Sequence, residues 1–365
     1  MSKLRVLFDA FELVPDSGKS IGIYHYAVSL WRALQSRADV ELEWVLACNG
    51  RNADALAGAL GSRQIVYPGA PSQWQRQAWL RWHAQALMRR EGCDVYFSPK
   101  GFLPGWWGRT FGVRTCAVVH DLIPLWYAEH HPGYFGRAEA WVVNRELQRT
   151  CRSADAVVTI SEAAAQDIRQ RCPGGSPPHV IHNGLPPVAV RPVPSGRVRP
   201  FIFAMASSLP HKNARMVLAG YQRYRACVDD PLDLVVCGID DPGQPGVTTI
   251  RGVSAEVLHG HYREARLFVF LSRTEGFGFP PLEAMAHGTP VLCSDIPVLR
   301  ETTCGNAVFV APDDASAIGA ALRETLSPEG HDTLMRLRGA APGVLARYSW
   351  SACAESVAGV LKSLA

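Results

Sequence analysis

Two glutamates flank a short stretch of glycine, aromatic residues and a double proline. Glu275 and Glu283 are separated by seven residues, in E-G-F-G-F-P-P-L-E, after an apolar run at 267–271 and where a helical pattern begins. Gly276 and Gly278 would let a ligand approach the loop backbone closely. We expect Glu283 in the first helical turn, where the helix dipole keeps it ionised and able to accept two hydrogen bonds from a vicinal diol. Taken alone, the pair is equally consistent with a first-turn acid and a solvated loop charge.

Two further polar residues follow apolar runs. His120 comes after the run at 115–119, and Lys212 lies between the run at 200–205 and a helical pattern. Taken alone, His120 is typical of a hydrogen-bonded histidine at a strand end, and Lys212 of a solvated lysine at a helix start. Ligands of open parallel sheets, however, bind beyond the carboxyl ends of the strands.

Strand and helix patterns alternate along the chain. Strands are predicted by short apolar runs at 5–9, 43–47, 95–98, 115–119, 156–160, 179–181, 200–205, 233–237, 267–271, 291–293 and 307–310. Helical spacing occurs at 21–36, 137–151, 162–171, 213–228, 280–287 and 315–327. Strands that alternate with helices predict parallel sheets covered on both faces. The expected fold class is therefore α/β, with doubly wound Rossmann-like domains.

A proline-rich stretch divides the chain. Residues 184–200 contain repeated prolines and almost no apolar periodicity, which is typical of a stiff linker. We expect an N-terminal domain at 1–185, a linker at 186–199 and a C-terminal domain at 200–345. A final helix at 346–365 could pack back on the first domain. The ligand is expected in a cleft between the two domains.

Composition excludes several classes of function. A net charge of +4 is too small to indicate nucleic acid, and the 47% hydrophobic and 19% charged residues are those of a globular protein. The ten cysteines occur singly, several of them inside apolar runs, which indicates a reducing compartment rather than a disulfide or zinc framework. No window is apolar enough to span a membrane, and the start of the chain does not resemble an export signal. We expect a cytoplasmic protein.

The glutamate stretch continues as E-A-M-A-H-G-T-P-V and, as a whole, resembles the signature of retaining glycosyltransferases with the GT-B fold, family 4, mannosyltransferase-like. A-S-S-L-P-H-K-N at 206–213 resembles the loop of that family that carries a phosphate-binding lysine. V-V-H-D-L-I-P-L at 118–125 resembles its H-D-L segment. The resemblance covers most of the chain and is weaker between 40 and 95.

The resemblance implies transfer of a hexose, with mannose favoured, from a nucleotide-diphosphate sugar to a glycan or a lipid-linked oligosaccharide in bacterial surface polysaccharide assembly. It implies retained anomeric configuration, no metal and no cofactor beyond the donor substrate, for which GDP-mannose is favoured. The residue roles that follow place the sugar on Glu275, the ribose on Glu283, the diphosphate on Lys212 and Gly22, the reaction centre near His120, and sugar and phosphate oxygens on the backbone of Gly276, Phe277 and Gly278. His120, Glu275 and Lys212 are the expected catalytic residues.

Two departures from the family pattern stand out. Ser207 and Ser208 occupy the place where many relatives have an arginine, so neutralisation of the diphosphate rests more on Lys212. Near the N-terminus, G-K-S-I-G-I-Y-H-Y stands where relatives often show G-G-I-G-R-Y, which keeps Gly22 but alters its surroundings.

The acceptor side contains a mixture of tryptophan and arginine. Residues 72–90 include three tryptophans and four arginines, and 101–112 is an aromatic loop. This composition is typical of a helix at an anionic membrane surface, so residues 72–112 could contact the inner face of the cytoplasmic membrane. Alternatively, the tryptophans form the core face of an ordinary helix.

Other functions remain open at this point. One alternative is rhamnosyl or other hexosyl transfer from a dTDP- or UDP-sugar. Another is a non-catalytic subunit that binds a nucleotide sugar or a glycan. A nicotinamide dehydrogenase is disfavoured, because no G-x-G-x-x-G follows the first predicted strand.

Overall fold

The computed structural model describes residues 3–15, 21–37, 41–57, 63–105, 113–185 and 199–365. The chain forms two compact units, Met1–Gly184 with Ser349–Ala365, and Leu185–Tyr348. The predicted linker lies outside the described residues except for position 199. Among the residues described, no helix is both long and apolar enough to cross a lipid bilayer.

The first unit is built on a seven-stranded sheet in the order β3-β2-β1-β4-β5-β6-β7. All its neighbouring strands pair in parallel. The strands are β1 (Leu4–Asp9), β2 (Leu42–Asn49), β3 (Arg63–Tyr67), β4 (Val95–Ser98), β5 (Arg114–Val118), β6 (Ala156–Thr159) and β7 (His179–Val180). Its helices are α1 (Ile21–Gln35), α2 (Ala53–Leu56), α3 (Gln73–Ala78), α4 (Ala84–Glu91), α5 (Ile123–His130), α6 (Arg137–Ser153), α7 (Glu162–Arg171) and α14 (Trp350–Lys362), and a π-helical turn, η2 (Trp79–His83), joins α3 to α4.

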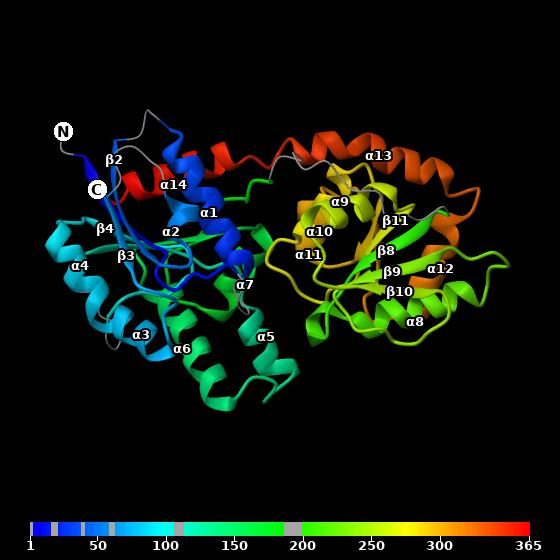
Figure 1. The fold of residues 1–365 in the computed structure, drawn as a ribbon, viewed down its shortest axis with the longest axis horizontal. Coiled ribbons are helices and arrows are strands. Elements are labelled where there is room, and N and C mark those ends of the chain that lie inside the picture. Colours follow the sequence, from blue (N-terminus) through cyan, green and yellow to red (C-terminus); the bar gives the residue numbers. More distant parts are fainter. Residues whose placement is uncertain (1–2, 16–20, 38–40, 58–62, 106–112, 186–198) are drawn as a thin grey trace. The chain divides into compact units, whose positions relative to one another are not determined.

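Helix α14 returns to the first unit and packs beside α1 (Figure 1). Its first residue, Trp350, meets Tyr26 of α1 edge-on, with ring centroids 5.8 Å apart. An added Cβ at Gly184 would overlap the backbone of Trp350, so the two segments cross at a glycine. The last helix therefore completes the core of the first unit, although the whole second unit lies between them in the sequence.

The second unit repeats the architecture with a six-stranded parallel sheet in the order β10-β9-β8-β11-β12-β13. Its strands are β8 (Phe201–Met205), β9 (Asp233–Cys237), β10 (Val247–Ile250), β11 (Leu267–Phe270), β12 (Val291–Ser294) and β13 (Val308–Val310). Its helices are α8 (Ala214–Arg225), α9 (Ala255–Glu264), α10 (Phe279–Ala286), α11 (Pro297–Thr302), α12 (Ala315–Leu326) and α13 (His331–Leu345), and a short 3₁₀ turn, η3 (Pro210–Lys212), precedes α8. The predicted α/β class with two parallel sheets is confirmed.

Two strands that the apolar pattern does not predict, β3 and β10, lie at sheet edges. Both are only partly buried along their length, unlike the interior strands β1 and β11. An edge strand has one solvated side, so its sequence lacks the continuous apolar run that marks a strand covered on both faces.

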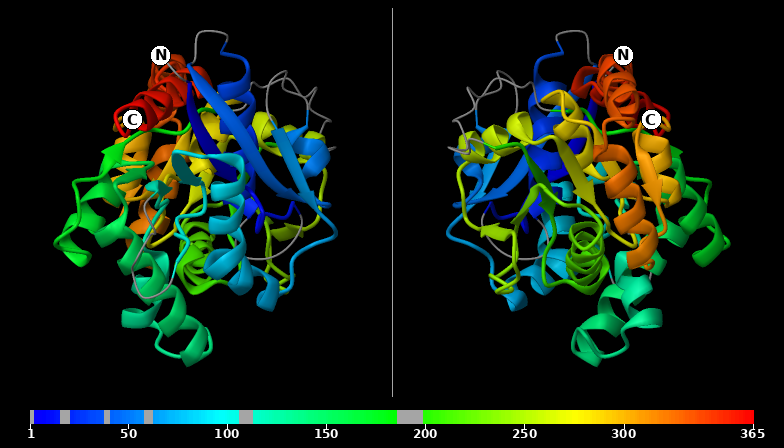
Figure 2. Two further views of the ribbon diagram at one scale, coloured as in Figure 1. Left: turned by 90° about the vertical axis from the view of Figure 1, so that its left-hand side faces the viewer. Right: turned by 90° about the vertical axis from the view of Figure 1, so that its right-hand side faces the viewer.

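Helices α8 and α12 cross at close range in the second unit (Figure 2). Gly220 of α8 faces the fully buried Ile318 of α12, and an added Cβ at Gly220 would overlap that side chain. Gly319 of α12 is also tight, since a Cβ there would lie 2.5 Å from the Cβ of Arg223. The pair of glycines sets the spacing of these helices, because a dense core leaves Ile318 little room to move.

The substitution Gly220→Ala should therefore destabilise the protein by about 1–3 kcal/mol, the usual cost of overpacking a core. Gly339→Ala is the matched control, since Gly339 lies inside α13 and an added Cβ there meets nothing within 4 Å. The control should gain roughly 0.5–1 kcal/mol from the better helix propensity of alanine. The free energy of unfolding in urea measures both, and equal values for the two variants would contradict the close crossing.

Candidate active site

The residues expected to bind a donor meet at the carboxyl edge of the second sheet. Lys212 follows β8 and Glu275 follows β11, and these strands are neighbours in register, with Ile202 beside Leu267. The Nζ of Lys212 lies 2.6 Å from the Oε1 of Glu275. The same ammonium lies 5.5 Å from the centre of the Phe270 ring. Parallel pairing therefore brings together two residues that are 63 positions apart in sequence.

The loop between β11 and α10 contains a glycine that the fold itself requires. Gly278 caps α10 with a left-handed backbone, φ 85°, and an added Cβ would lie 2.5 Å from Leu299. Phe277 is buried, and its ring contacts Phe279 and Tyr348. Of these three residues, Gly276, Phe277 and Gly278, it is therefore the backbone rather than a side chain that suits a ligand. This backbone lies at the N-terminus of a helix, which favours anions.

The expectation that Glu283 lies in the first turn of its helix is wrong. Helix α10 begins at Phe279, which places Glu283 in the second turn, and no acidic residue occupies the first. Burial raises the pKa of Glu283, and a hydrogen bond from the Tyr262 hydroxyl to its Oε2, 2.9 Å long, partly offsets that effect. The desolvation of the carboxylate outweighs the helix dipole, which fades beyond the first turn. The expected contact with a ribose stays a prediction.

Sequence patterns missed two residues that shape this edge. Tyr262 lies on α9, a helix that was not predicted. Arg273 lies two residues before Glu275, and its guanidinium bonds to Asp313 and to the carbonyl of Pro210. The position of Arg273 close to Glu275 in the sequence is the signal that could have identified it as a site residue.

Two residues expected at the site lie in the first unit, His120 just beyond β5 and Gly22 in the first turn of α1. His120 Nε2 lies 2.8 Å from the Pro99 carbonyl oxygen, so Nε2 carries the proton and donates, which leaves Nδ1 as an acceptor. Burial lowers the pKa of His120 to about 4, and the Pro99 bond opposes this weakly. Its ring meets Tyr26 edge-on at 4.7 Å. His120 is thus a neutral imidazole near pH 7.

Gly22 is exposed, and no described atom lies within 4 Å of an added Cβ. Nothing in the described part of the chain therefore requires glycine at this position. The residues before α1, at 16–20, lie outside the described residues. Binding of a diphosphate by Gly22 stays a prediction.

One part of the tryptophan-rich stretch is core. Trp79 is only 1% exposed, stacks on Phe11 at 4.4 Å and donates its indole N–H to Asp9 Oδ2 at 2.8 Å. Tyr96 also donates to that carboxylate. Burial raises the pKa of Asp9 to about 6, and the bonds from Tyr96 and Trp79 limit the rise. A membrane role for Trp79 is wrong, since its polar atom already has a buried partner.

The neighbouring side chains Trp74 and Trp82 differ from Trp79, being 84% and 54% exposed. The aromatic loop at 101–112 belongs to the same predicted membrane contact, and residues 106–112 lie outside the described residues.

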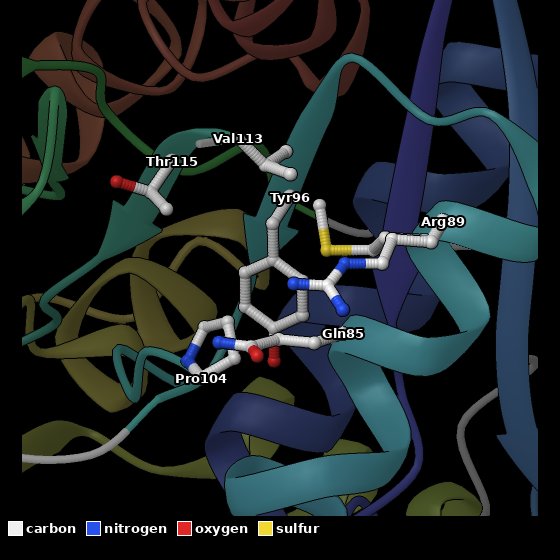
Figure 3. A pocket seen from close by; sticks show the side chains of 7 residues that line it. Gln85, Arg89, Tyr96, Pro104, Val113 and Thr115 are labelled. Atoms are coloured by element: carbon white, nitrogen blue, oxygen red, sulfur yellow. The ribbon is translucent and has the colours of Figure 1, made fainter. Parts of the chain in front are cut away.

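A small pocket in the first unit contains none of the expected site residues. Figure 3 shows Gln85 and Arg89 from α4, Tyr96 from β4 and Thr115 from β5 around it, with Pro104 and Val113. The Gln85 Nε2 atom is buried without a hydrogen-bond partner. Tyr96, which lines the pocket, is also the residue whose hydroxyl bonds to Asp9.

Across the described part of the chain, no group of three or more His, Cys, Asp or Glu side chains is arranged to hold a metal ion.

Comparison with known proteins identifies relatives of both units. Residues 22–188 match the family model described as Glycosyltransferase Family 4, and residues 193–328 match that of Glycosyl transferases group 1. The chain is 26% identical over 326 residues to the O-antigen chain mannosyltransferase RfbU of Salmonella typhimurium, covering 84% of this chain and 88% of that protein. It is also 26% identical over 321 residues to O-antigen chain mannosyltransferase B of Escherichia coli, covering 80% and 78%.

A shorter match is to the GDP-mannose:cellobiosyl-diphosphopolyprenol alpha-mannosyltransferase of Komagataeibacter xylinus, 31% identical over 144 residues, or 39% of this chain and 36% of that one. Among solved structures, the chain is similar to a sucrose-phosphate synthase from Thermosynechococcus elongatus, with TM-score 0.71, 17% identity and 99% of each chain covered. It is also similar to HepE of Anabaena in complex with UDP and glucose, with TM-score 0.69, 15% identity and 99% and 100% covered.

The neutral state of His120, whose side chain is partly buried, predicts a pH dependence of stability. Its folded pKa, about 4, lies below the usual 6.5, so the unfolded chain binds this proton first as the pH falls. The stabilisation is full above pH 6.5 and is lost as the pH falls towards 4. His120→Gln keeps an N–H donor for Pro99 but cannot titrate. The unfolding free energy of this variant should therefore fall less steeply with pH in this window, with a slope that corresponds to up to about one bound proton fewer.

Urea unfolding at several pH values between 4 and 7 measures this difference. His83→Gln, at an exposed histidine of the same unit, is the matched control and should run parallel to the wild type, because it removes no buried ring. A His120→Gln curve that also runs parallel would refute the burial of a neutral imidazole.

Proposed function

Because the chain belongs to the family-4 glycosyltransferases and has their GT-B fold, we propose that it is a retaining, metal-independent hexosyltransferase that moves mannose from GDP-mannose to a glycan or lipid-linked oligosaccharide. The observation that carries the proposal is the ion pair of Lys212 and Glu275 at the carboxyl edge of the second sheet. It lies beside the N-termini of α8 and α10, where backbone N–H groups favour anions.

The ammonium of Lys212 has donors to spare for a diphosphate. Its three N–H groups make one bond to Glu275, 2.6 Å long, and the others can reach phosphate oxygens. When the bond from the anomeric carbon to the diphosphate breaks, negative charge grows on the leaving oxygen. A fixed cation stabilises that growing charge more than the ground state, which lowers the barrier.

Transfer with retention places the acceptor oxygen on the face that the diphosphate leaves. The acceptor hydroxyl forms the new bond to the anomeric carbon, and its proton passes to the departing phosphate oxygen. The products are a glycoside and a nucleoside diphosphate, so the step needs no protein nucleophile. Glu275 accepts hydrogen bonds from sugar hydroxyls, and neutral His120 offers Nδ1 as an acceptor in the first unit.

The names of the relatives support mannose as the sugar. RfbU and O-antigen chain mannosyltransferase B are both named for mannose, and the Komagataeibacter enzyme is named for GDP-mannose and a diphosphopolyprenol acceptor. We place this chain in the assembly of a bacterial surface polysaccharide, at the inner face of the cytoplasmic membrane.

A panel of GDP-mannose, dTDP-rhamnose, UDP-glucose, UDP-N-acetylglucosamine and ADP-glucose tests the donor. Of these five donors, we expect only GDP-mannose to raise the melting temperature strongly and to be consumed with release of GDP. The substitutions Glu275→Gln and Lys212→Met should each lower turnover by roughly 10²–10³-fold, the usual loss when one group of a preorganised charge-stabilising site is removed. Glu256→Gln, at an exposed first-turn acid of α9, is the matched control and should leave turnover unchanged.

The outcomes separate the alternatives. Wild-type turnover in either site variant would refute the site, and selective response to another donor would refute mannose. Binding of a nucleotide sugar without any transfer would favour a non-catalytic subunit. NMR of the product's anomeric signal tests retention.

Exposed tryptophans beside arginines support a membrane contact by α3 and η2. Trp74 and Trp82 expose large indole rings, whereas Trp79 between them is buried. Indole rings settle at the headgroup level of bilayers, and nearby arginines attract anionic lipids.

The double substitution Trp74→Ser with Trp82→Ser should therefore lower binding to vesicles that contain anionic lipid, with little change in melting temperature. A sedimentation assay measures it, and Met335→Ser, at an exposed apolar residue of α13, is the control. Unchanged sedimentation of the double variant would count against this surface.

A further inference from the structure

Arg273 joins three loops at the carboxyl edge of the second sheet. It follows β11, and its Nε and Nη2 atoms bond to the carboxylate of Asp313 at 2.7 and 2.6 Å. Its Nη1 donates to the Pro210 carbonyl at 3.2 Å. Its backbone N–H donates to the His211 carbonyl at 2.8 Å.

The bonds from Arg273 end on the turn that carries Lys212. Pro210 and His211 are the first two residues of η3, and Lys212 is the last. Asp313 lies just before α12, and the same segment is tied to the start of α8 by a bond from Asn213 Nδ2 to the Pro312 carbonyl, 2.7 Å long. The loops after β8, β11 and β13 are thus joined through one guanidinium and one amide.

These contacts add little to the stability of the fold. The Asp313 side chain is 63% exposed and that of Arg273 is 23% exposed, so the ion pair resembles surface pairs, whose contribution is small. Their effect is geometric, because a planar guanidinium donates in two fixed directions at once. An ammonium on a flexible stem has no such fork and cannot hold both Asp313 and Pro210 in one geometry.

We propose that Arg273 is a positioning residue, which fixes the η3 turn against the β11 loop and so holds Lys212 and Glu275 in the orientation that a donor diphosphate requires. This inference rests on the proposed function. Arg273 acts through Lys212 and Glu275, because each of its three side-chain nitrogens is already bonded to Asp313 or Pro210, which fixes the guanidinium between these loops.

Three variants separate positioning from charge. Arg273→Ala and Arg273→Lys should lower kcat by similar amounts, about 100-fold, since misplacement of a site by an ångström costs this much. Asp313→Asn keeps the charge of Arg273 but weakens its anchor, and should also lower kcat. If Arg273 instead neutralised the diphosphate, Arg273→Lys would restore most activity, and Asp313→Asn would bind GDP more tightly than the wild type.

The assays are GDP affinity by calorimetry, kcat and KM with the nucleotide sugar identified by the panel, and melting temperature. The matched control is Arg199→Lys, in an exposed pair with Asp230 that is bonded at 2.7 and 2.8 Å before β8, at the other end of the strand. It should behave as the wild type in all three assays.

The outcomes distinguish a failure of the positioning role from a failure of the proposed function. An active wild type with unchanged kcat in Arg273→Ala, or with rescue by Arg273→Lys, overturns the positioning role and leaves the proposed function intact. A wild type that neither binds nor transfers any nucleotide sugar of the panel overturns both.

Discussion

The ion pair of Lys212 and Glu275 exists because two parallel strands end at the same edge of a sheet. Neither residue has a local reason to meet the other, and the pairing of β8 with β11 brings their loops to the same edge. The surrounding structure serves this placement. Gly278 turns the chain into α10, and the buried ring of Phe277 anchors the loop by packing against Tyr348. Without the β8 and β11 register, the charges would remain in separate loops.

Two polar side chains of the first unit, Asp9 and His120, are instead held by hydrogen bonds with neutral groups. Asp9 accepts bonds from Tyr96, Trp79 and the Phe11 backbone, which satisfies a carboxylate in the core. His120 donates to a backbone carbonyl and stays neutral. Under the proposed function, neutral His120 would suit an uncharged sugar hydroxyl, and the ammonium of Lys212 would suit phosphate.

Interior strands and helix starts could be predicted from the sequence, because their signals are local. The run at 267–271 and the double proline after it fix β11 and α10 almost to the residue. The edge strands β3 and β10 could not, since half-solvated strands have mixed sequences. Within the tryptophan stretch, spacing could not separate Trp79 from Trp82. The π-helical turn η2 shifts the face, and the partner of Trp79 is 70 residues away. Likewise, the partner of Glu283 lies on α9, 21 residues before it in the sequence.

The two glutamates that look alike in the sequence differ in their partners, and this difference bears on what each can bind. Glu275 faces an ammonium, whereas Glu283 faces the neutral hydroxyl of Tyr262 and has a raised pKa. Since Tyr262 occupies Oε2, Oε1 is the oxygen of Glu283 best placed for a ligand hydroxyl. Under the proposed function, Glu283 would hold its diol mainly through that oxygen rather than by a bidentate grip. The burial that raises its pKa also strengthens such a bond, because water competes poorly for a buried carboxylate.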